Sequence, residues 1–482
     1  MSDLINNSYD LIVIGSGPAG EKAAVKAAYF GKKVALIEKS PDAGGAGVQT
    51  GTLPSKALKE TALYFSRVYE KQIYDQSNSH LRKMKHEQFT YRRDIARTDM
   101  QEEVDNNLLR HKVDVYRGFA SFTDEHKISI KSDKADKDII IEGKNILIAT
   151  GSYPVNPPEI PFDGKRIHDS DTILKIKRFP KSLCVIGAGV IGCEYATIYA
   201  AMGVKVYLIN NRDRILPFLD KDISEALVTQ MKNRGVEILF NTSITDYKNP
   251  KLKKDNILLT LKNGDELQTD MVLYAAGRSG NIKGLDCDKA GIITGERETI
   301  IVNENYRTNI PHIYAAGDVV GFPALASTSM DQGRVAIAHM FDTRDLDSVP
   351  KIFPYGIYTV PEVSMVGMSE QEVISSGISY NTGISRVCDI ARGKIQGSSD
   401  DGFLKMIFEN ESKVILGVHI IGRIANELIH YGMTLVQDKK TLDQVIATVF
   451  NYPTFHDLYK YAAYDGLGNR SGKNIKNPKK VE

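Results

Sequence analysis

The sequence is poor in cysteine, in long apolar runs and in charge of one sign, and each shortage excludes a class of protein. The four cysteines show no CxxC or similar ligand spacing, so we expect no metal centre: Cys184, Cys193, Cys287 and Cys388. We interpret them as reduced, mostly buried residues of a cytoplasmic protein. No apolar stretch reaches the roughly 18 residues that cross a bilayer, so we expect no membrane segment. The net charge of +2 gives no reason to expect nucleic-acid binding.

Length and composition describe a soluble protein of several domains. A chain of 482 residues is too long for one core, and its 42% apolar and 25% charged residues are typical of globular proteins. Residues 1–10 are polar and lead directly into a predicted strand, so no signal peptide is expected. Residues 471–482 are basic and are expected to form a flexible tail.

The N-terminal region carries a complete dinucleotide-binding signature. A strand with β-branched residues at 10–15 leads through Gly15, Gly17 and Gly20 into an Ala-rich helix, and a second strand ends at Glu38. The first glycine permits the tight turn, the second lets the backbone approach a pyrophosphate, and the third lets helix and strand pack closely. Glu38 has the place from which a carboxylate can accept hydrogen bonds from ribose hydroxyls.

The same pattern recurs in the middle of the chain. A strand at 182–186 enters a loop with Gly187, Gly189 and Gly192, and after a helix the returning strand at 204–209 follows. We therefore predict two nucleotides bound by two related domains, so that electrons can pass between them. Two such domains of which only one binds a nucleotide remain the alternative.

Three further strands and a change of pattern complete the organisation. Strands at 145–151 and 271–277 end in Gly151 and Gly277 and are expected to carry the chain between the two domains, and a strand at 312–318 ends in Asp318. Beyond residue 350 no Gly-rich phosphate loop occurs. Short strands are predicted there at 356–360, 363–366, 404–408 and 414–420, with helices at 425–437 and 442–447.

The fold class predicted is therefore α/β, with two Rossmann-like domains and a C-terminal α+β domain that serves as an interface. The expected boundaries are 1–153 with 277–348 for the first domain, 154–276 for the second, 349–470 for the interface domain and 471–482 for the tail. The segment 60–110 is helical in pattern, and we expect it to pack beside the first domain.

The order of these motifs resembles the pyridine nucleotide–disulfide oxidoreductase family over nearly the whole chain. The resemblance implies a glutathione reductase-like fold, FAD as cofactor, NAD(H) and NADP(H) as substrates, and a homodimer formed through the last domain. The implied FAD-binding residues are Gly15, Gly17, Gly20, Glu38, Lys56, Gly118, Ala120, Gly151, Asp318 and Ala326. The implied nicotinamide nucleotide-binding residues are Gly187, Gly189, Gly192, Glu194, Asn210, Arg212 and Gly277.

The same resemblance assigns roles near the flavin. Lys56 and Glu194 match an ion pair that the family places beside flavin N5 and are the expected catalytic residues. Asp318 would hold the ribityl chain, and the helix that starts near Ala326 would direct its N-terminus at the N1/C2 carbonyl region.

Two departures from the family pattern remove the usual dithiol chemistry. Gly47 and Thr52 occupy the positions of the two redox cysteines, and neither can form a thiolate or a disulfide. Tyr452 stands where the family has its acid–base histidine, and a phenol is a poor base at pH 7. His456 lies four residues further on and is interpreted as a surface or interface residue. We therefore predict no disulfide reductase activity.

Within the family the chain resembles the soluble pyridine nucleotide transhydrogenase branch, through its Gly-Thr-Leu-Pro-Ser-Lys and Asn-Tyr-Pro-Thr segments and residues 208–214. The resemblance implies hydride transfer between NADPH and NAD⁺ by a ping-pong flavin mechanism. The second unit ends its strand in neutral Asn210, followed by Arg212 and Arg214, a set that fits both nucleotides if the arginines do not simply face solvent. An NAD(P)H diaphorase or quinone reductase and a non-catalytic flavin redox sensor remain alternatives.

Overall fold

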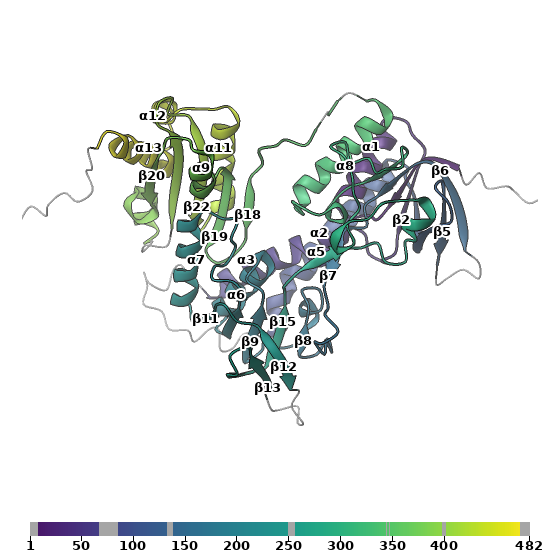
Figure 1. Cartoon of the computed structure of the whole chain (residues 1–482), viewed down its shortest axis with the longest axis horizontal. Coiled ribbons are helices and arrows are strands. Elements are labelled where there is room, and N and C mark those ends of the chain that lie inside the picture. Colours follow the sequence, from purple (N-terminus) through teal and green to yellow (C-terminus); the bar gives the residue numbers. More distant parts are fainter. Residues whose placement is uncertain are drawn as a thin grey trace, which may run out of the picture.

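The computed structural model describes residues 8–66, 85–132, 138–248, 256–343, 345–346, 348–397 and 402–472. Three lobes surround a central pair of helices (Figure 1). Among the described residues no helix combines the length and apolar character needed to span a bilayer.

The first lobe is built on a seven-stranded sheet. In spatial order the strands are β3 (Asp114–Arg117), β2 (Val34–Glu38), β1 (Ser8–Ile14), β6 (Ile139–Ile148), β5 (Lys127–Lys131) and β4 (Phe119–Phe122), with β17 (Ile313–Ala315) also paired to β6. In β1, Leu11 and Val13 pack under the helices, whereas Ile12 and Ile14 contact the opposite core. Both faces are covered, so residues 11–14 of the strand are all apolar and do not alternate with polar residues.

Two helices cover one face of this sheet, α1 (Pro18–Tyr29) and α8 (Ala326–Phe341). They lie side by side at the upper right of Figure 1 although about 300 residues separate them in the chain. Small residues permit this approach, because a Cβ at Gly333 of α8 would lie 2.3 Å from the Ala19 carbonyl oxygen of α1. The early and late parts of the chain therefore form one unit.

The second lobe repeats the design with a five-stranded parallel sheet. Its order is β11 (Val236–Leu239), β10 (Lys205–Ile209), β9 (Ser182–Ile186), β15 (Met271–Tyr274) and β8 (Ile167–His168). A small antiparallel sheet of β12 (Ile244–Lys248), β13 (Ile257–Leu261) and β14 (Glu266–Thr269) lies beside it. The helix α6 (Val190–Ala201) follows β9 and is buried almost all round, which explains its largely apolar sequence.

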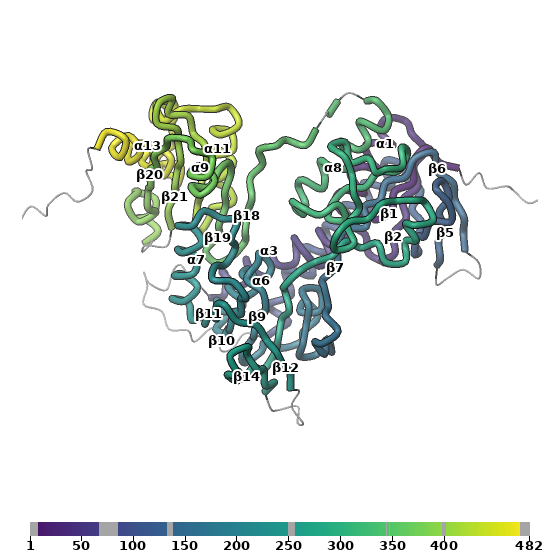
Figure 2. The backbone as a smooth tube through the Cα atoms, in the orientation of Figure 1, coloured from purple at the N-terminus to yellow at the C-terminus, as the bar shows by residue number. Residues whose placement is uncertain are grey.

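The chain crosses between these lobes twice, at one place. The strands β7 (Ser152–Pro154) and β16 (Arg278–Gly280) pair antiparallel and directly follow Gly151 and Gly277. Figure 2 shows the two crossings side by side near the middle of the molecule. The strands predicted at 145–151 and 271–277 thus lead to the lobe junction.

The third lobe holds an antiparallel sheet of β18 (Tyr355–Ile357), β19 (Glu362–Gly367), β22 (Ile415–Gly422), β21 (Phe403–Glu409) and β20 (Tyr380–Arg386). The helices α11 (Ala425–Gln437) and α12 (Leu442–Ala447) have the predicted bounds. The sequence did not predict β20 or α13 (Asp457–Arg470). Both are rich in small and polar residues, and they pack on each other through glycine, since a Cβ at Gly383 would lie 2.0 Å from the Ala462 carbonyl oxygen.

The segment predicted to be helical, 60–110, contains α5 (His86–Arg110) and the end of α3 (Thr52–Ser66), and residues 67–84 lie outside the described residues. One core cluster joins Leu58 of α3 and Phe89 of α5 to Leu183 and Tyr199 of the second lobe and Ile357 of the third. The two helices therefore pack in the centre of the molecule, not only beside the first lobe. This packing brings α3 against α6 and creates the site described next.

Candidate functional site

A cavity of about 930 Å³ lies where the three lobes meet. Eleven of the residues predicted from the sequence line it: Gly15, Gly17, Glu38, Lys56, Gly118, Ala120, Gly151, Glu194, Gly277, Asp318 and Ala326. Gly20 lies behind its wall, and the remaining five predicted residues, Gly187, Gly189, Gly192, Asn210 and Arg212, belong to the second lobe outside it. The cavity therefore collects nearly the whole first set of predicted residues.

The first glycine loop has the shape that a bound pyrophosphate needs. Gly15 adopts φ +104°, and a Cβ at Gly20 would lie 1.9 Å from the Gly15 carbonyl oxygen. Helix α1 begins at Pro18 with no side-chain cap from Gly17. Its first N–H groups are therefore available to an anion in the cavity.

Glu38 presents a partly engaged carboxylate to the cavity. Its Oε2 accepts hydrogen bonds from the Ser16 N–H at 2.8 Å and the Ser16 hydroxyl at 2.6 Å, and its Oε1 accepts one from the Ser40 N–H at 2.8 Å. The hydroxyl of Ser16 accepts the Gly44 N–H at 3.1 Å, which fixes the arrangement. Because a carboxylate offers about four acceptor positions, Oε1 keeps one for a ribose hydroxyl.

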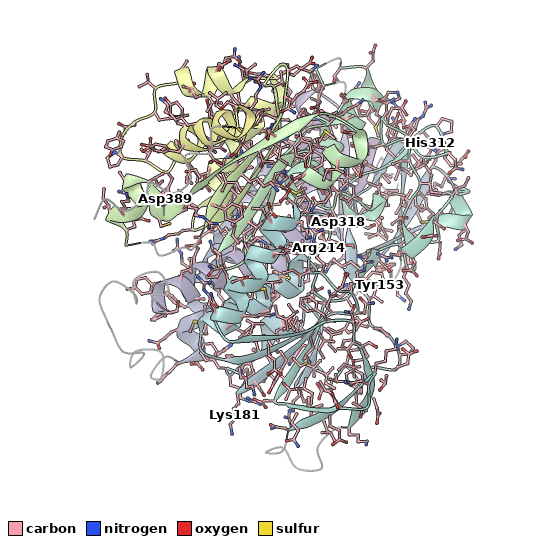
Figure 3. All side chains as sticks on the ribbon, turned by 60° about the vertical axis from the view of Figure 1, so that its left-hand side comes forward. Tyr153, Lys181, Arg214, His312, Asp318 and Asp389 are labelled. Carbon is pink, nitrogen blue, oxygen red and sulfur yellow. The ribbon has the colours of Figure 1, made fainter. Side chains whose placement is uncertain are left out.

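Asp318 and the start of α8 also line the cavity. Asp318 accepts a hydrogen bond from the Ser152 hydroxyl at 3.0 Å, and Figure 3 shows it near the middle of the molecule. Helix α8 begins at Ala326 without a side-chain cap, so its N-terminal partial positive charge faces the cavity. A cavity lined by two uncapped helix N-termini and by an acid that can bind ribose fits a flavin dinucleotide.

Lys56 and Glu194 meet across two lobes inside this cavity. The Lys56 Nζ lies 2.9 Å from both carboxylate oxygens of Glu194, which is 3% exposed. Glu194 also accepts the Tyr358 N–H at 3.0 Å and the Ser55 hydroxyl at 3.3 Å. The Lys56 Nζ also lies 4.7 Å from the centre of the Tyr358 ring. A pair with a buried carboxylate, a partly buried ammonium and this many supports is held in a single geometry.

The cavity contains the two positions that would carry redox cysteines, and neither holds sulfur. Gly47 in α2 (Gly45–Gln49) and Thr52 at the start of α3 both line it. None of the cysteines, all of which the structure describes, is among the lining residues. Burial raises the pKa of the thiols of Cys184 and Cys193, and that of Cys287 to about 11. These three thiols therefore stay protonated near neutral pH.

The second glycine loop has the same geometry as the first, with φ +102° at Gly187 and a Cβ at Gly192 placed 1.8 Å from the Gly187 carbonyl oxygen. Asn210 differs from Glu38: its Nδ2 donates to the carbonyls of Arg212 at 3.2 Å and Arg214 at 2.9 Å. Arg214, which Figure 3 labels, donates to the Leu219 carbonyl, whereas Arg212 is exposed. Only Arg212 therefore keeps its guanidinium free to turn toward a phosphate.

Tyr452 and His456 lie in the third lobe and do not line the cavity. The Tyr452 side chain is exposed, and the His456 ring packs against the rings of Phe450, Tyr431 and Tyr459. Burial lowers the pKa of His456. Its ring contacts agree with a packing role.

Three residues of the site were missed from the sequence. Arg278 donates to the Ser152 hydroxyl and carbonyl, each at 2.8 Å, and its position directly after Gly277 could have indicated it. Tyr358 and Asn426 enter from the third lobe, and no local motif marks them. In the described part of the chain, no group of three or more His, Cys, Asp or Glu side chains could hold a metal ion.

Comparison with known proteins finds relatives over nearly the whole chain. Residues 9–333 match the family described as pyridine nucleotide-disulphide oxidoreductase, and residues 353–463 match the dimerisation domain of that family. The soluble pyridine nucleotide transhydrogenase of Mycobacterium bovis is 40% identical over 471 residues, covering 97% of this chain and 98% of that protein. The transhydrogenase of Hahella chejuensis is 38% identical, covering 95% and 98%.

Solved structures show the same architecture. LpdA from Mycobacterium tuberculosis superposes with a TM-score of 0.86 and 26% identity, covering 94% of this chain and 99% of that one. The HOCl-induced flavoprotein disulfide reductase RclA from Escherichia coli has a TM-score of 0.83 and 26% identity, with the same coverage. The predicted glutathione reductase-like fold is thus confirmed.

Proposed function

Because this chain belongs to the pyridine nucleotide-disulphide oxidoreductase family, we propose that it is an FAD-dependent soluble pyridine nucleotide transhydrogenase. It moves hydride between NADPH/NADP⁺ and NADH/NAD⁺ in a ping-pong sequence at one nucleotide site. Residues 1–153 and 277–348 hold FAD, residues 154–276 hold the nicotinamide nucleotide, and residues 349–470 form the interface. The full-length similarity to proteins named as transhydrogenases supports the assignment.

One observation carries the proposal. The cavity keeps the buried Lys56–Glu194 pair but has Gly47 and Thr52 where the resemblance places redox cysteines. Electrons that enter such a site have no dithiol to reduce. A second small molecule must therefore accept them. Hydride exchange between nucleotides requires no general base, which agrees with Tyr452 in the position of the family's histidine.

The residues of the chain supply binding and electrostatics. FAD, when bound, would supply the two-electron hydride carrier. The first turn of α1 and Glu38 bind its pyrophosphate and ribose, and Asp318 binds the ribityl chain. The N-terminus of α8 stabilises negative charge by about 0.3–2 kcal/mol. The Lys56–Glu194 pair ties α3 to α6 and would thereby fix the wall of the cavity that faces the reacting side of the flavin.

The third lobe supports a homodimer. It matches the family's dimerisation domain and exposes Val449, Tyr452, Tyr461 and Tyr464, large apolar or aromatic side chains typical of an interface. The free cysteines agree with a cytoplasmic location.

The test is transfer from NADPH to thio-NAD⁺ by the purified, FAD-loaded protein with no other acceptor. We expect rapid transfer with parallel-line kinetics, because both nucleotides use one site in turn. A different result would be that NADPH reduces the flavin, that thio-NAD⁺ cannot reoxidise it and that a quinone can. The protein would then be a quinone reductase instead. If NADPH does not reduce the flavin, both assignments are wrong.

A further inference from the structure

One wall of the central cavity comes from the third lobe and has no role in the proposed function so far. It consists of β18 with its flanking residues and of one face of α11. On α11 the lining residues are Asn426, Ile429 and His430, which the i, i+3 and i+4 spacing places together on that face. This wall therefore contains a buried polar side chain, Asn426, to which the proposed function gives no role.

The carboxamide of Asn426 is buried and has no partner. Its residue is 7% exposed, and neither Oδ1 nor Nδ2 makes a hydrogen bond to any residue that the structure describes. A buried amide with both functions unsatisfied costs free energy, so such groups are uncommon unless a ligand completes them.

The surroundings hold this amide in place. The backbone N–H of Asn426 donates to Glu362 at 3.1 Å, and Glu362 pairs with the buried ammonium of Lys59. The Asn426 Oδ1 lies directly over Gly356, where a Cβ would approach it to 2.7 Å. Gly356 leaves room for this orientation of the carboxamide, and the Glu362–Lys59 pair holds the backbone from which the side chain projects.

The same wall supports the Lys56–Glu194 pair. Tyr358, two residues after Gly356, donates its N–H to Glu194, and its ring lies 4.7 Å from the Lys56 Nζ and 5.9 Å from the Lys59 Nζ. The Tyr358 side chain therefore lies between the Asn426 amide and the Lys56–Glu194 pair. A ring placed for hydride transfer at Lys56 and Glu194 would have its substituents near Asn426.

We propose that Asn426 binds the carboxamide of the nicotinamide ring, an inference that rests on the proposed function. A carboxamide offers an acceptor oxygen and an NH₂ donor group, so it satisfies both free functions of Asn426 at once. A quinone carbonyl, which only accepts, would leave Oδ1 unpaired. Asn426 is thus a specificity residue that distinguishes nicotinamide nucleotides from other acceptors in the same cavity.

The experiment compares three ligands by calorimetry on the oxidised FAD-loaded protein: NAD⁺, 3-acetylpyridine adenine dinucleotide and ADP-ribose. The acetyl analogue replaces the amide NH₂ by a methyl group, and ADP-ribose lacks the ring. Between oxidised partners no hydride moves, so the titration measures binding alone. The variant is Asn426→Leu, which has a similar size and no hydrogen-bonding function. Glu427→Gln, an exposed change in the same turn, is the control.

We expect the wild type and Glu427→Gln to bind NAD⁺ about 5- to 20-fold more tightly than the acetyl analogue, the range of one buried hydrogen bond. Asn426→Leu should bind the two equally and bind ADP-ribose as the wild type does. Its melting temperature should be unchanged or higher, because an unsatisfied buried amide is removed.

Three results would overturn the inference. Equal binding of NAD⁺ and the acetyl analogue by the wild type would show that the protein does not recognise the nicotinamide carboxamide. Retained discrimination in Asn426→Leu would place the recognition elsewhere. A changed flavin content or flavin spectrum in the variant, with nucleotide discrimination intact, would assign Asn426 to the flavin. Failure of the proposed function is separate, since it appears as absent flavin reduction by NADPH in the wild type.

Discussion

The two nucleotide-binding units of this chain share a backbone and differ at one terminal residue. Their strand orders correspond, β3-β2-β1-β6 and β11-β10-β9-β15, and their first glycines have φ +104° and +102°. At the end of the second strand, however, Glu38 turns its carboxylate to the cavity, whereas Asn210 donates its amide to its own turn. The proposed phosphate contacts would therefore use the same backbone geometry in both units, whereas the proposed ribose contacts would differ in one side chain.

The helices after the two loops also differ in surroundings. Helix α1 is covered by α8 on one side, whereas α6 is enclosed by its own sheet, by α3 and by the third lobe. Enclosure allows α6 to carry Glu194 into the cavity, where it meets Lys56. The second unit thus supplies a charged group to the site of the first.

Removing the carboxylate of the first unit should have the largest effect. In Glu38→Ala, the Ser16 hydroxyl and N–H lose their acceptor and a ribose hydroxyl loses its own, so we expect FAD affinity to fall about 100-fold. The measurement is the flavin-to-protein absorbance ratio after dialysis. Glu142→Ala, an exposed acid of the same sheet, should keep its flavin. Full flavin content in Glu38→Ala would show that Glu38 does not bind FAD, and this difference between the two units would then not hold.

Neutralising the acid that the second unit contributes should have the next largest effect. Glu194→Gln keeps the shape but leaves the Lys56 ammonium without its counter-charge. We expect flavin reduction by NADPH to slow roughly 10- to 30-fold, or about 1.4–2 kcal/mol, with FAD content unchanged. Stopped-flow absorbance measures this, with Glu225→Gln on the exposed face of the second lobe as control. An unchanged rate would limit the pair to a structural role.

The local parts of both units could be predicted from sequence, and the parts made by distant packing could not. The glycine loops, Glu38 and the bounds of α11 follow from short-range pattern, because turns, caps and periodicity are local. Arg278 had a weak signal after Gly277. Tyr358 and Asn426 had none, because they reach the cavity through the docking of the third lobe on α3. The neutral Asn210 was recognised from the sequence, whereas its hydrogen bonds to the Arg212 and Arg214 carbonyls, which close a turn, required the structure.

Giving the second unit the acid of an NAD-specific site should weaken its proposed use of nucleotides that carry a 2′-phosphate. In Asn210→Asp, a carboxylate would repel that phosphate, and we expect kcat/KM for NADPH to fall about 10-fold relative to NADH. Asp cannot donate to the Arg212 and Arg214 carbonyls, so damage to the turn would lower both nucleotides together. The ratio of the two values is therefore the measurement. Asn211→Asp, the exposed neighbour, is the control.

Removing the free guanidinium of the second unit should have the smallest effect. Arg212 is exposed, whereas Arg214 is held by the Leu219 carbonyl, so the 2′-phosphate can gain a partner from Arg212 without breaking the turn. For Arg212→Ala we expect kcat/KM for NADPH to fall about 3- to 10-fold, the range of an exposed charge pair, with NADH unchanged. The loss should shrink as salt rises, because an exposed pair is screened. Lys232→Ala makes the same charge change elsewhere on this lobe and should leave the NADPH to NADH ratio unaltered. If both variants lower the ratio equally, the preference arises from the overall charge of the second lobe, and the comparison of Glu38 with Asn210 does not extend to the phosphate.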